Sequence, residues 1–222
     1  MPAPLNSEPL FDGLIVDWGG VLTGNLREAV NRWAVADDID IDAYAQIMRS
    51  WLGEEGELEA RLNPIHALER GEIEVPHFEE RLADELTRRG KRPVAAQGLL
   101  QRMFDFFEHS HDMFGLVRRA RGLGIRTALL SNSWGNSYPD DLWQDMFDVT
   151  VISGEVGMRK PEERIFRHTF DLLGLPPTSC VFVDDLEHNI RAGAQLGMVG
   201  VLHTSYEETR RELDVLFGID LT

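Results

Sequence analysis

Short apolar runs, each followed by a polar or glycine-containing segment, recur along the chain. The first is Leu14-Ile15-Val16, and further runs span residues 126–130, 149–152, 180–183 and 199–203. Runs of this length that contain β-branched residues are typical of buried strands. Between and before the later runs lie stretches with helical periodicity, near residues 113–123, 162–173 and 186–196. Because strands alternate with helices, the pattern predicts an α/β fold with a parallel sheet.

The roughly one hundred residues after the first run carry a different pattern. Helical periodicity appears over residues 26–35, 41–52, 77–86 and 99–107, without a convincing strand between them. Phe78, Leu82 and Leu86 recur at every fourth position with charged residues between them, which is typical of an amphipathic helix. We therefore expect an all-helical insert over residues 24–108, within an α/β core formed by residues 1–23 and 109–222.

Polar residues follow the predicted strands at the points where these end. The residues concerned are Asp17, Ser131, Lys160 and the adjacent pair Asp184 and Asp185. In an open α/β sheet, ligands bind at the carboxyl ends of the strands. If the strands are parallel neighbours, one sheet edge collects a candidate nucleophile, a hydroxyl, a fixed cation and a pair of carboxylates.

Four short motifs carry a resemblance to a known family. In chain order they are Asp17-x-Gly19-Gly20-Val21, Leu130-Ser131-Asn132, Lys160-Pro161 and Asp184-Asp185-x-x-x-Asn189. They resemble the four ordered motifs of the haloacid dehalogenase-like hydrolase superfamily, over about residues 11–203. Each motif alone is weak, whereas four in the right order, each after a predicted strand, form a strong signal. The resemblance implies a Rossmann-like core and a helical cap over the active site.

The same residues predict a phosphatase. Asp17 is the expected nucleophile, whose attack on phosphorus would form an aspartyl-phosphate. Phosphoryl transfer depends on positioning and on neutralising charge, so we expect Ser131, Asn132 and Lys160 to bind the phosphate, with Ser131 and Lys160 also taking part in catalysis. The expected substrate is a small phosphorylated metabolite.

The acidic pair predicts a metal site. Asp184 and Asp185 repel each other unless a cation binds, and together with Asp17 they suit Mg²⁺. The resemblance adds the backbone carbonyl of Gly19 as a further ligand.

Gly19 is also a departure from the family pattern. Most phosphatases of the family carry there a second aspartate, which protonates the leaving group, although some relatives also have Asp-x-Gly. General acid–base catalysis contributes about 10²–10⁴-fold. The absence of this second aspartate predicts a preference for substrates whose leaving group departs readily as an anion. Two alternatives stay open: a metal-independent haloacid dehalogenase, against which Asp184 and Asp185 argue, and a degenerate member that binds a phosphorylated ligand or a protein partner.

Composition and charge limit the kinds of partner that the protein is expected to bind. The 222 residues are 43% hydrophobic and carry a formal net charge of −16, which argues against nucleic acid as a partner. No apolar run reaches the ~18 residues that a membrane span needs. The single cysteine, Cys180, and a beginning without a secretory signal predict a cytoplasmic protein. A homodimer is compatible with these features. His109 and His111 are expected in a linker near a helix start.

Overall fold

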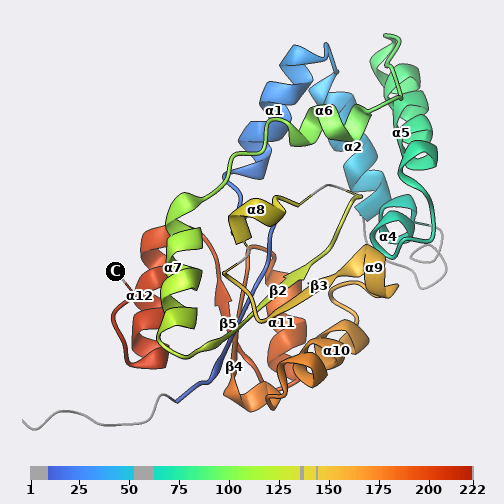
Figure 1. Cartoon of the computed structure of the whole chain (residues 1–222). Coiled ribbons are helices and arrows are strands. Elements are labelled where there is room, and N and C mark those ends of the chain that lie inside the picture. Colours follow the sequence, from blue (N-terminus) through green and yellow to red (C-terminus); the bar gives the residue numbers. More distant parts are fainter. Residues whose placement is uncertain (1–9, 53–62, 136–137, 144, 222) are drawn as a thin grey trace, which may run out of the picture.

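A parallel sheet lies at the centre of the fold (Figure 1). The computed structural model describes residues 10–52, 63–135, 138–143 and 145–221. The strands are β1 (Gly13–Val16), β2 (Arg126–Ser131), β3 (Val149–Ile152), β4 (Cys180–Asp184) and β5 (Val199–Leu202). They pair in the order β3-β2-β1-β4-β5, and every pair is parallel. The predicted α/β class with a parallel sheet is confirmed.

The central strand β1 is buried on both faces, which explains its continuous apolar sequence. Leu14 and Val16 pack in one cluster with residues of α7 (His111–Gly122) and α12 (Tyr206–Phe217). Ile15 points to the other face, in a cluster with residues of α10 (Glu163–Leu173) and, more peripherally, α11 (Glu187–Gln195). The helices therefore cover both faces of the sheet, and its carboxyl edge is left for a site.

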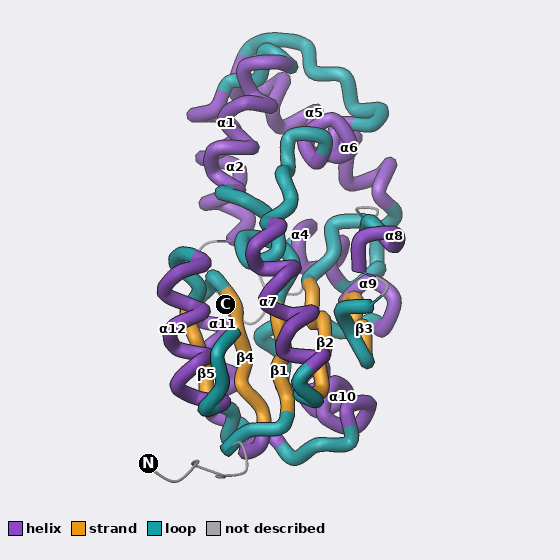
Figure 2. Tube along the Cα trace, turned by 60° about the vertical axis from the view of Figure 1, so that its left-hand side comes forward, coloured by secondary structure: helices purple, strands orange, loops and turns teal. Residues whose placement is uncertain are grey.

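The segment after β1 forms the helical insert, by which we mean α1 to α6. Its helices are α1 (Leu26–Ala36), α2 (Ile41–Leu52), α4 (Pro64–Glu69), α5 (Val75–Gly90) and α6 (Leu99–Phe104). They share an apolar cluster of their own, in which Trp33, Phe78 and Leu82 are fully buried. Figures 1 and 2 show the insert as a separate layer of helices beyond one end of the sheet.

Two connecting segments join the insert to the core, and they run side by side. Thr23 and His109 form an antiparallel bridge. The Gly24 N–H donates to the Glu108 carbonyl at 2.7 Å, and the Ser110 N–H donates to the Leu22 carbonyl at 2.9 Å. His109 thus lies in a linker and His111 begins α7, as predicted.

Several elements differ from the sequence prediction. The short helices α4, α8 (Asp140–Trp143) and α9 (Ser153–Val156) and the long helix α12 were not expected. The buried residues of α12, Thr209, Leu213 and Phe217, recur at every fourth position, and the Ser205 side chain caps the helix by accepting from the Glu208 N–H at 3.3 Å. None of the helices in the described part of the chain has the length and apolarity that crossing a bilayer requires.

Candidate active site

The residues predicted from strand ends lie at one edge of the sheet. Asp17 directly follows β1, Ser131 is the last residue of β2, and Asp184 is the last residue of β4, next to Asp185. Since β1 lies between β2 and β4, these residues are neighbours across adjacent strands. The Asp17 N–H continues the ladder by donating to the Val183 carbonyl at 3.0 Å.

Lys160 lies at the centre of this edge. Its side chain is fully buried, and its Nζ lies 2.8 Å from Asp17 Oδ1 and 2.7 Å from Asp184 Oδ2. Burial alone would lower the pKa of this ammonium group, but the charges of the two carboxylates outweigh burial and raise the pKa above its ordinary value. Lys160 is therefore a permanent cation that links the ends of β1 and β4.

The environment of Asp17 disfavours its charged form. Burial is the main cause that raises the pKa of Asp17, and repulsion from Asp184 and Asp185 adds to it, while Lys160 acts in the opposite direction. Burial and the charge of Asp184 likewise raise the pKa of Asp185, to about 6. One lysine thus faces three carboxylates, and the arrangement favours an additional cation.

Asp184 and Asp185 have different surroundings. Asp184 accepts hydrogen bonds from Lys160 Nζ, from the Leu186 N–H at 2.8 Å and from the buried Asn189 amide at 3.0 Å. Its oxygens are therefore engaged by protein donors. Asp185 lies against Gly20 instead: a Cβ at Gly20 would overlap the Asp185 carboxylate, and Gly20 has a positive φ of 72°. Only glycine fits this turn without displacing Asp185.

The acidic residues meet the geometric requirement of a cation site. One carboxylate oxygen from each of Asp17, Asp184 and Asp185 lies within 4.8 Å of the others. Magnesium binds few protein carboxylates and keeps several waters, so a small set of oxygens at one rim is adequate. The hydrogen bonds that Asp184 accepts favour Asp17 and Asp185 as direct ligands and Asp184 as the residue that anchors Lys160. Gly19 lies in the turn after β1, half-buried, and its role as a ligand stays a prediction.

Ser131 and Asn132 contact different partners. The Ser131 hydroxyl is nearly buried and lies 3.0 Å from the Tyr138 hydroxyl. The Asn132 side chain holds the backbone of Lys160 on both sides: its Oδ1 accepts from the Lys160 N–H at 2.8 Å, and its Nδ2 donates to the Lys160 carbonyl at 3.0 Å. The side chain of Asn132 therefore positions Lys160, and the phosphate contact of Asn132 stays a prediction.

Tyr138 is a residue of this region that was not expected from the sequence. Its ring stacks on Trp143, with centroids 5.1 Å apart and planes 16° apart, and meets Trp18 edge-on at 5.5 Å. Trp18 directly follows Asp17, so these aromatic rings link the nucleophile position to the loop after β2. The only sequence signal was an aromatic residue seven positions after Ser131, which is too common to single out.

A buried ion pair between the insert and the core was also not expected from the sequence. Glu69, at the end of α4, pairs with Arg159, and both side chains are about nine-tenths buried. The Trp134 indole N–H donates to the same carboxylate at 3.1 Å. Next to this pair, Arg70 lies 3.1 Å from Glu162. Because these partners are 90 or more positions apart, no local pattern could have revealed them.

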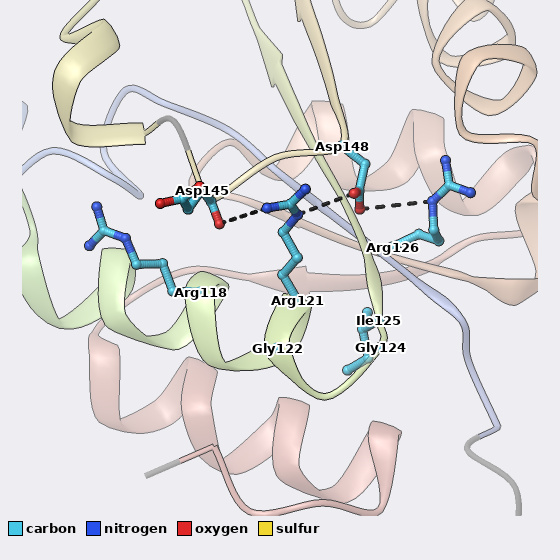
Figure 3. A pocket seen from close by; sticks show the side chains of 8 residues that line it. All are labelled: Arg118, Arg121, Gly122, Gly124, Ile125, Arg126, Asp145 and Asp148. Atoms are coloured by element: carbon cyan, nitrogen blue, oxygen red, sulfur yellow. Dashed lines mark hydrogen bonds and ion pairs between the residues drawn. The ribbon is translucent and has the colours of Figure 1, made fainter.

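Two cavities lie at opposite ends of the sheet. The smaller, of about 340 Å³, lies between the insert and the carboxyl ends of β2 and β3, and Tyr138 is one of its walls. The larger, of about 490 Å³, lies beside the start of β2 (Figure 3). There Arg121 and Arg126 flank Asp148 at 3.1 and 3.8 Å and tie α7 to the segment before β3. That cavity is separated from Ser131 by the length of β2.

Cys180, the single cysteine of the chain, has a structural role. Cys180 begins β4 in the apolar core, where burial, with a contribution from Asp12, raises the pKa of its thiol to about 11. The thiol is therefore kept protonated and unreactive.

Comparisons with known proteins agree with this geometry. A family model described as haloacid dehalogenase-like hydrolase matches residues 11–197. Acyl-CoA dehydrogenase family member 10 from Mus musculus is 28% identical over 219 residues, which are 95% of this chain and 20% of that protein. N-acylneuraminate-9-phosphatase from Mus musculus is 46% identical over 56 residues, 25% of this chain and 23% of that protein. The chain thus spans about a fifth of the length of these curated relatives.

A solved structure shares the fold. A HAD family enzyme from Bacteroides thetaiotaomicron, in its magnesium complex, superposes with a TM-score of 0.62 at 23% identity, covering 88% of this chain and 94% of that one.

Proposed function

This chain belongs to the haloacid dehalogenase-like hydrolases, and from that premise we propose that it is a magnesium-dependent phosphatase. Its substrate is a small phosphorylated metabolite, which it hydrolyses through an aspartyl-phosphate on Asp17. The observation that carries the proposal is Lys160, buried between Asp17 and Asp184 and beside Asp185. The N-acylneuraminate-9-phosphatase relative and the magnesium complex of the structural relative support it.

In the first half of the reaction, a carboxylate oxygen of Asp17 attacks phosphorus. A bond forms between this oxygen and phosphorus, and the bond from phosphorus to the leaving oxygen breaks with its electron pair. Lys160 and the Ser131 hydroxyl neutralise and orient the phosphoryl oxygens. When bound at Asp17 and Asp185, magnesium supplies further positive charge against the transferring phosphoryl group.

In the second half, water hydrolyses the acyl phosphate and releases inorganic phosphate. Asp17 is regenerated as a carboxylate. Asn132 and Asp184 hold Lys160 in place from its backbone and from its ammonium group, respectively. Positioning of this kind lets the site act without reorganising its charges during the reaction.

Gly19 determines which leaving groups are favoured. Without a carboxylate at this position, the departing oxygen leaves without its usual proton donor, so sugar 1-phosphates, acyl phosphates and aryl phosphates are favoured over simple alkyl phosphates. The position has room for a side chain, because a Cβ there would lie 3.6 Å from its nearest neighbour, Leu26 Cδ1. Gly19→Asp should therefore raise kcat/KM for alkyl phosphates by about 10²-fold or more and flatten the dependence on leaving-group pKa.

We further propose that the helical insert is a cap, so that residues 24–108 form one domain and residues 1–23 with 109–222 the other. The buried contact of Glu69 with Arg159 supports this division of roles, because it fixes the insert next to the loop that carries Lys160. A closed cap excludes water from the site, which strengthens its electrostatic interactions.

The proposal is tested on the purified chain with a panel of phosphorylated metabolites, each with magnesium and with EDTA. We expect turnover that EDTA abolishes, and magnesium binding by calorimetry that Asp185→Asn weakens. Asp12→Asn is the matched control, since Asp12 is exposed at the opposite end of β1. Hydrolysis of a haloacid in EDTA would replace the proposal with the dehalogenase alternative, and phosphate binding without turnover would replace it with the degenerate one.

A further inference from the structure

The cavity of about 340 Å³ beneath the insert has a chemical character of its own. Leu68, Ile73 and Val75 line it from the insert, and Ile152 lines it from the end of β3. Among the described residues that line it, none is a lysine, arginine or histidine. Its charged wall residues are the exposed Glu74 and Glu155, so most of its uncharged side chains are apolar, Ser133 and backbone groups add polar surface, and negative charge borders it.

The cavity adjoins the proposed phosphate site. Tyr138 is part of its wall, and the Tyr138 hydroxyl lies 3.0 Å from Ser131 Oγ. The same ring lies 5.5 Å from that of Trp18, the residue after Asp17. A phosphate held by Ser131 and Lys160 would therefore place its organic part next to Tyr138, on the side where the cavity lies.

Close backbone contacts build the cavity walls. A Cβ at Gly71 of the insert would lie 2.6 Å from the Gly154 carbonyl oxygen of the core. A Cβ at Gly135 would overlap the Val75 side chain. Both glycines have positive φ, so the chain can bring insert and core together here only because side chains are absent. The volume is within the range of small-molecule sites, at its lower end.

We infer that this cavity receives the alcohol part of the substrate and selects an apolar, uncharged alcohol. The inference rests on the proposed phosphatase function and specifies its substrate class: the phosphate monoester of an aryl alcohol. Apolar walls gain by covering an apolar group. An alcohol that carries a carboxylate or a second phosphate meets no cation in the cavity and is repelled by Glu74 and Glu155.

The experiment compares two aryl phosphates of nearly equal reactivity. In 4-ethylphenyl phosphate and 4-(carboxymethyl)phenyl phosphate the substituent is insulated from the phenol by a methylene, so mainly charge and polarity differ. We expect kcat/KM at least about tenfold higher for the ethyl compound. Equal kcat/KM for the two aryl phosphates, or a preference for the carboxylate, would overturn the inference.

Two pairs of variants assign the preference to the cavity. Val75→Thr keeps the shape of the wall and adds a hydroxyl, so KM for 4-ethylphenyl phosphate should rise about three- to tenfold with kcat little changed. Its control is Val35→Thr, since Val35 is 85% exposed on α1.

Glu74→Gln combined with Glu155→Gln should raise kcat/KM for the carboxymethyl compound about threefold. Glu80→Gln, at an exposed position of α5 that does not line the cavity, should leave it unchanged. Equal effects of the Val75 and Val35 variants would contradict the assignment.

A binding measurement separates this inference from the proposed function. Titration of 4-ethylphenol into the protein, followed by calorimetry, needs no turnover. If none of the phosphates is hydrolysed, the proposed function fails, whereas the inference fails if 4-ethylphenol does not bind or binds Val75→Thr as it binds the unaltered chain.

Discussion

Two buried charge clusters meet at the loop that carries Arg159 and Lys160, and they differ in their balance. Lys160 faces the carboxylates of Asp17 and Asp184, with Asp185 beside them. Arg159 faces Glu69, whose other oxygen accepts from the Trp134 indole. We call these the core cluster and the insert contact. The insert contact is neutral as it stands, whereas the core cluster carries excess negative charge.

This difference indicates which of the two is built for a ligand. A balanced pair with its hydrogen bonds satisfied needs nothing further and fixes two elements against each other. An unbalanced cluster raises the pKa of its members, as it does for Asp17 and Asp185, until a cation arrives. Under the proposed function, adjacent residues of one loop therefore have different roles: Lys160 takes part in the chemistry, whereas Arg159 fixes the insert.

The largest expected effect lies in the core cluster. Asp17→Asn keeps the shape of the side chain but removes the nucleophile, so we expect kcat to fall by about 10⁴-fold or more while the fold remains. Phosphatase assays and circular dichroism would check this, with Asp12→Asn as the control. Retained activity would take Asp17 out of the mechanism.

Replacing Lys160 and Arg159 in turn compares how much each cluster contributes to the free energy of unfolding. Lys160→Met leaves three crowded carboxylates without a cation, and we expect a loss of about 3–5 kcal/mol in the free energy of unfolding. Arg159→Met leaves one carboxylate that water can reach if the insert shifts, so about 1–3 kcal/mol is expected. Magnesium should stabilise the Lys160 variant more than it stabilises the unaltered chain, and the Arg159 variant by the same amount as the unaltered chain, because the core cluster of that variant is intact.

Thermal and denaturant unfolding with and without magnesium measure this comparison. Equal losses in the two variants, with no difference in the response to magnesium, would show that the two clusters do not differ in the way described.

A smaller effect is expected from Glu69→Gln. The amide keeps the size of the side chain and still accepts from the Trp134 indole, but it no longer pairs with the charge of Arg159. Because the insert would be held less firmly, we expect KM to rise about three- to tenfold with a modest change in kcat. Steady-state kinetics would show it. A fall in kcat as large as that of Asp17→Asn would mean that Glu69 takes part in the chemistry.

The smallest effect concerns pH. Burial alone would raise the pKa of Glu162. The hydrogen bonds from Arg164, Arg159 and Arg70 outweigh burial and hold this pKa below its ordinary value of 4.5. A carboxylate with a lowered folded pKa contributes stability that is present above pH 4.5 and is lost as the pH falls through the folded pKa. The contact of Arg70 with Glu162 should therefore weaken only in acid.

Amide hydrogen exchange of α4 against pH measures this loosening. Glu162→Gln should remove the acid step, because the amide does not titrate. An acid step of the same size in this variant would place the titrating group elsewhere.

The site residues that could be predicted from sequence share one property: each lies at, or a short loop after, the end of a predicted strand. β1 and β4 are buried on both faces, so their apolar runs are continuous and their ends are marked by Asp17 and Asp184. Parallel pairing then brings these residues together whatever the rest of the chain does. The same reasoning placed Ser131 and Lys160 at this edge.

The features that escaped prediction depend on contacts between distant segments. Glu69 and Arg159 pair across 90 positions, and Tyr138 reaches Ser131 from a loop with no periodic pattern. The side chain of Asn132 holds the backbone of Lys160, a role that only the geometry of two loops determines. The helix α12 is different, because its buried residues Thr209, Leu213 and Phe217 recur at every fourth position, a pattern that does indicate a helix.

The paired connecting segments have a consequence for how this protein can be rebuilt. The Gly24 N–H and the Glu108 carbonyl are 2.7 Å apart, so the chain leaves the core and returns to it at almost the same point. The distance to be closed after excision of the intervening helices is that of a tight turn, and the entropy of closing so short a loop is small. We therefore expect that a different set of helices, or a simple turn, can replace the insert between these two points without displacing β1, provided that the buried partner of Arg159 is also replaced.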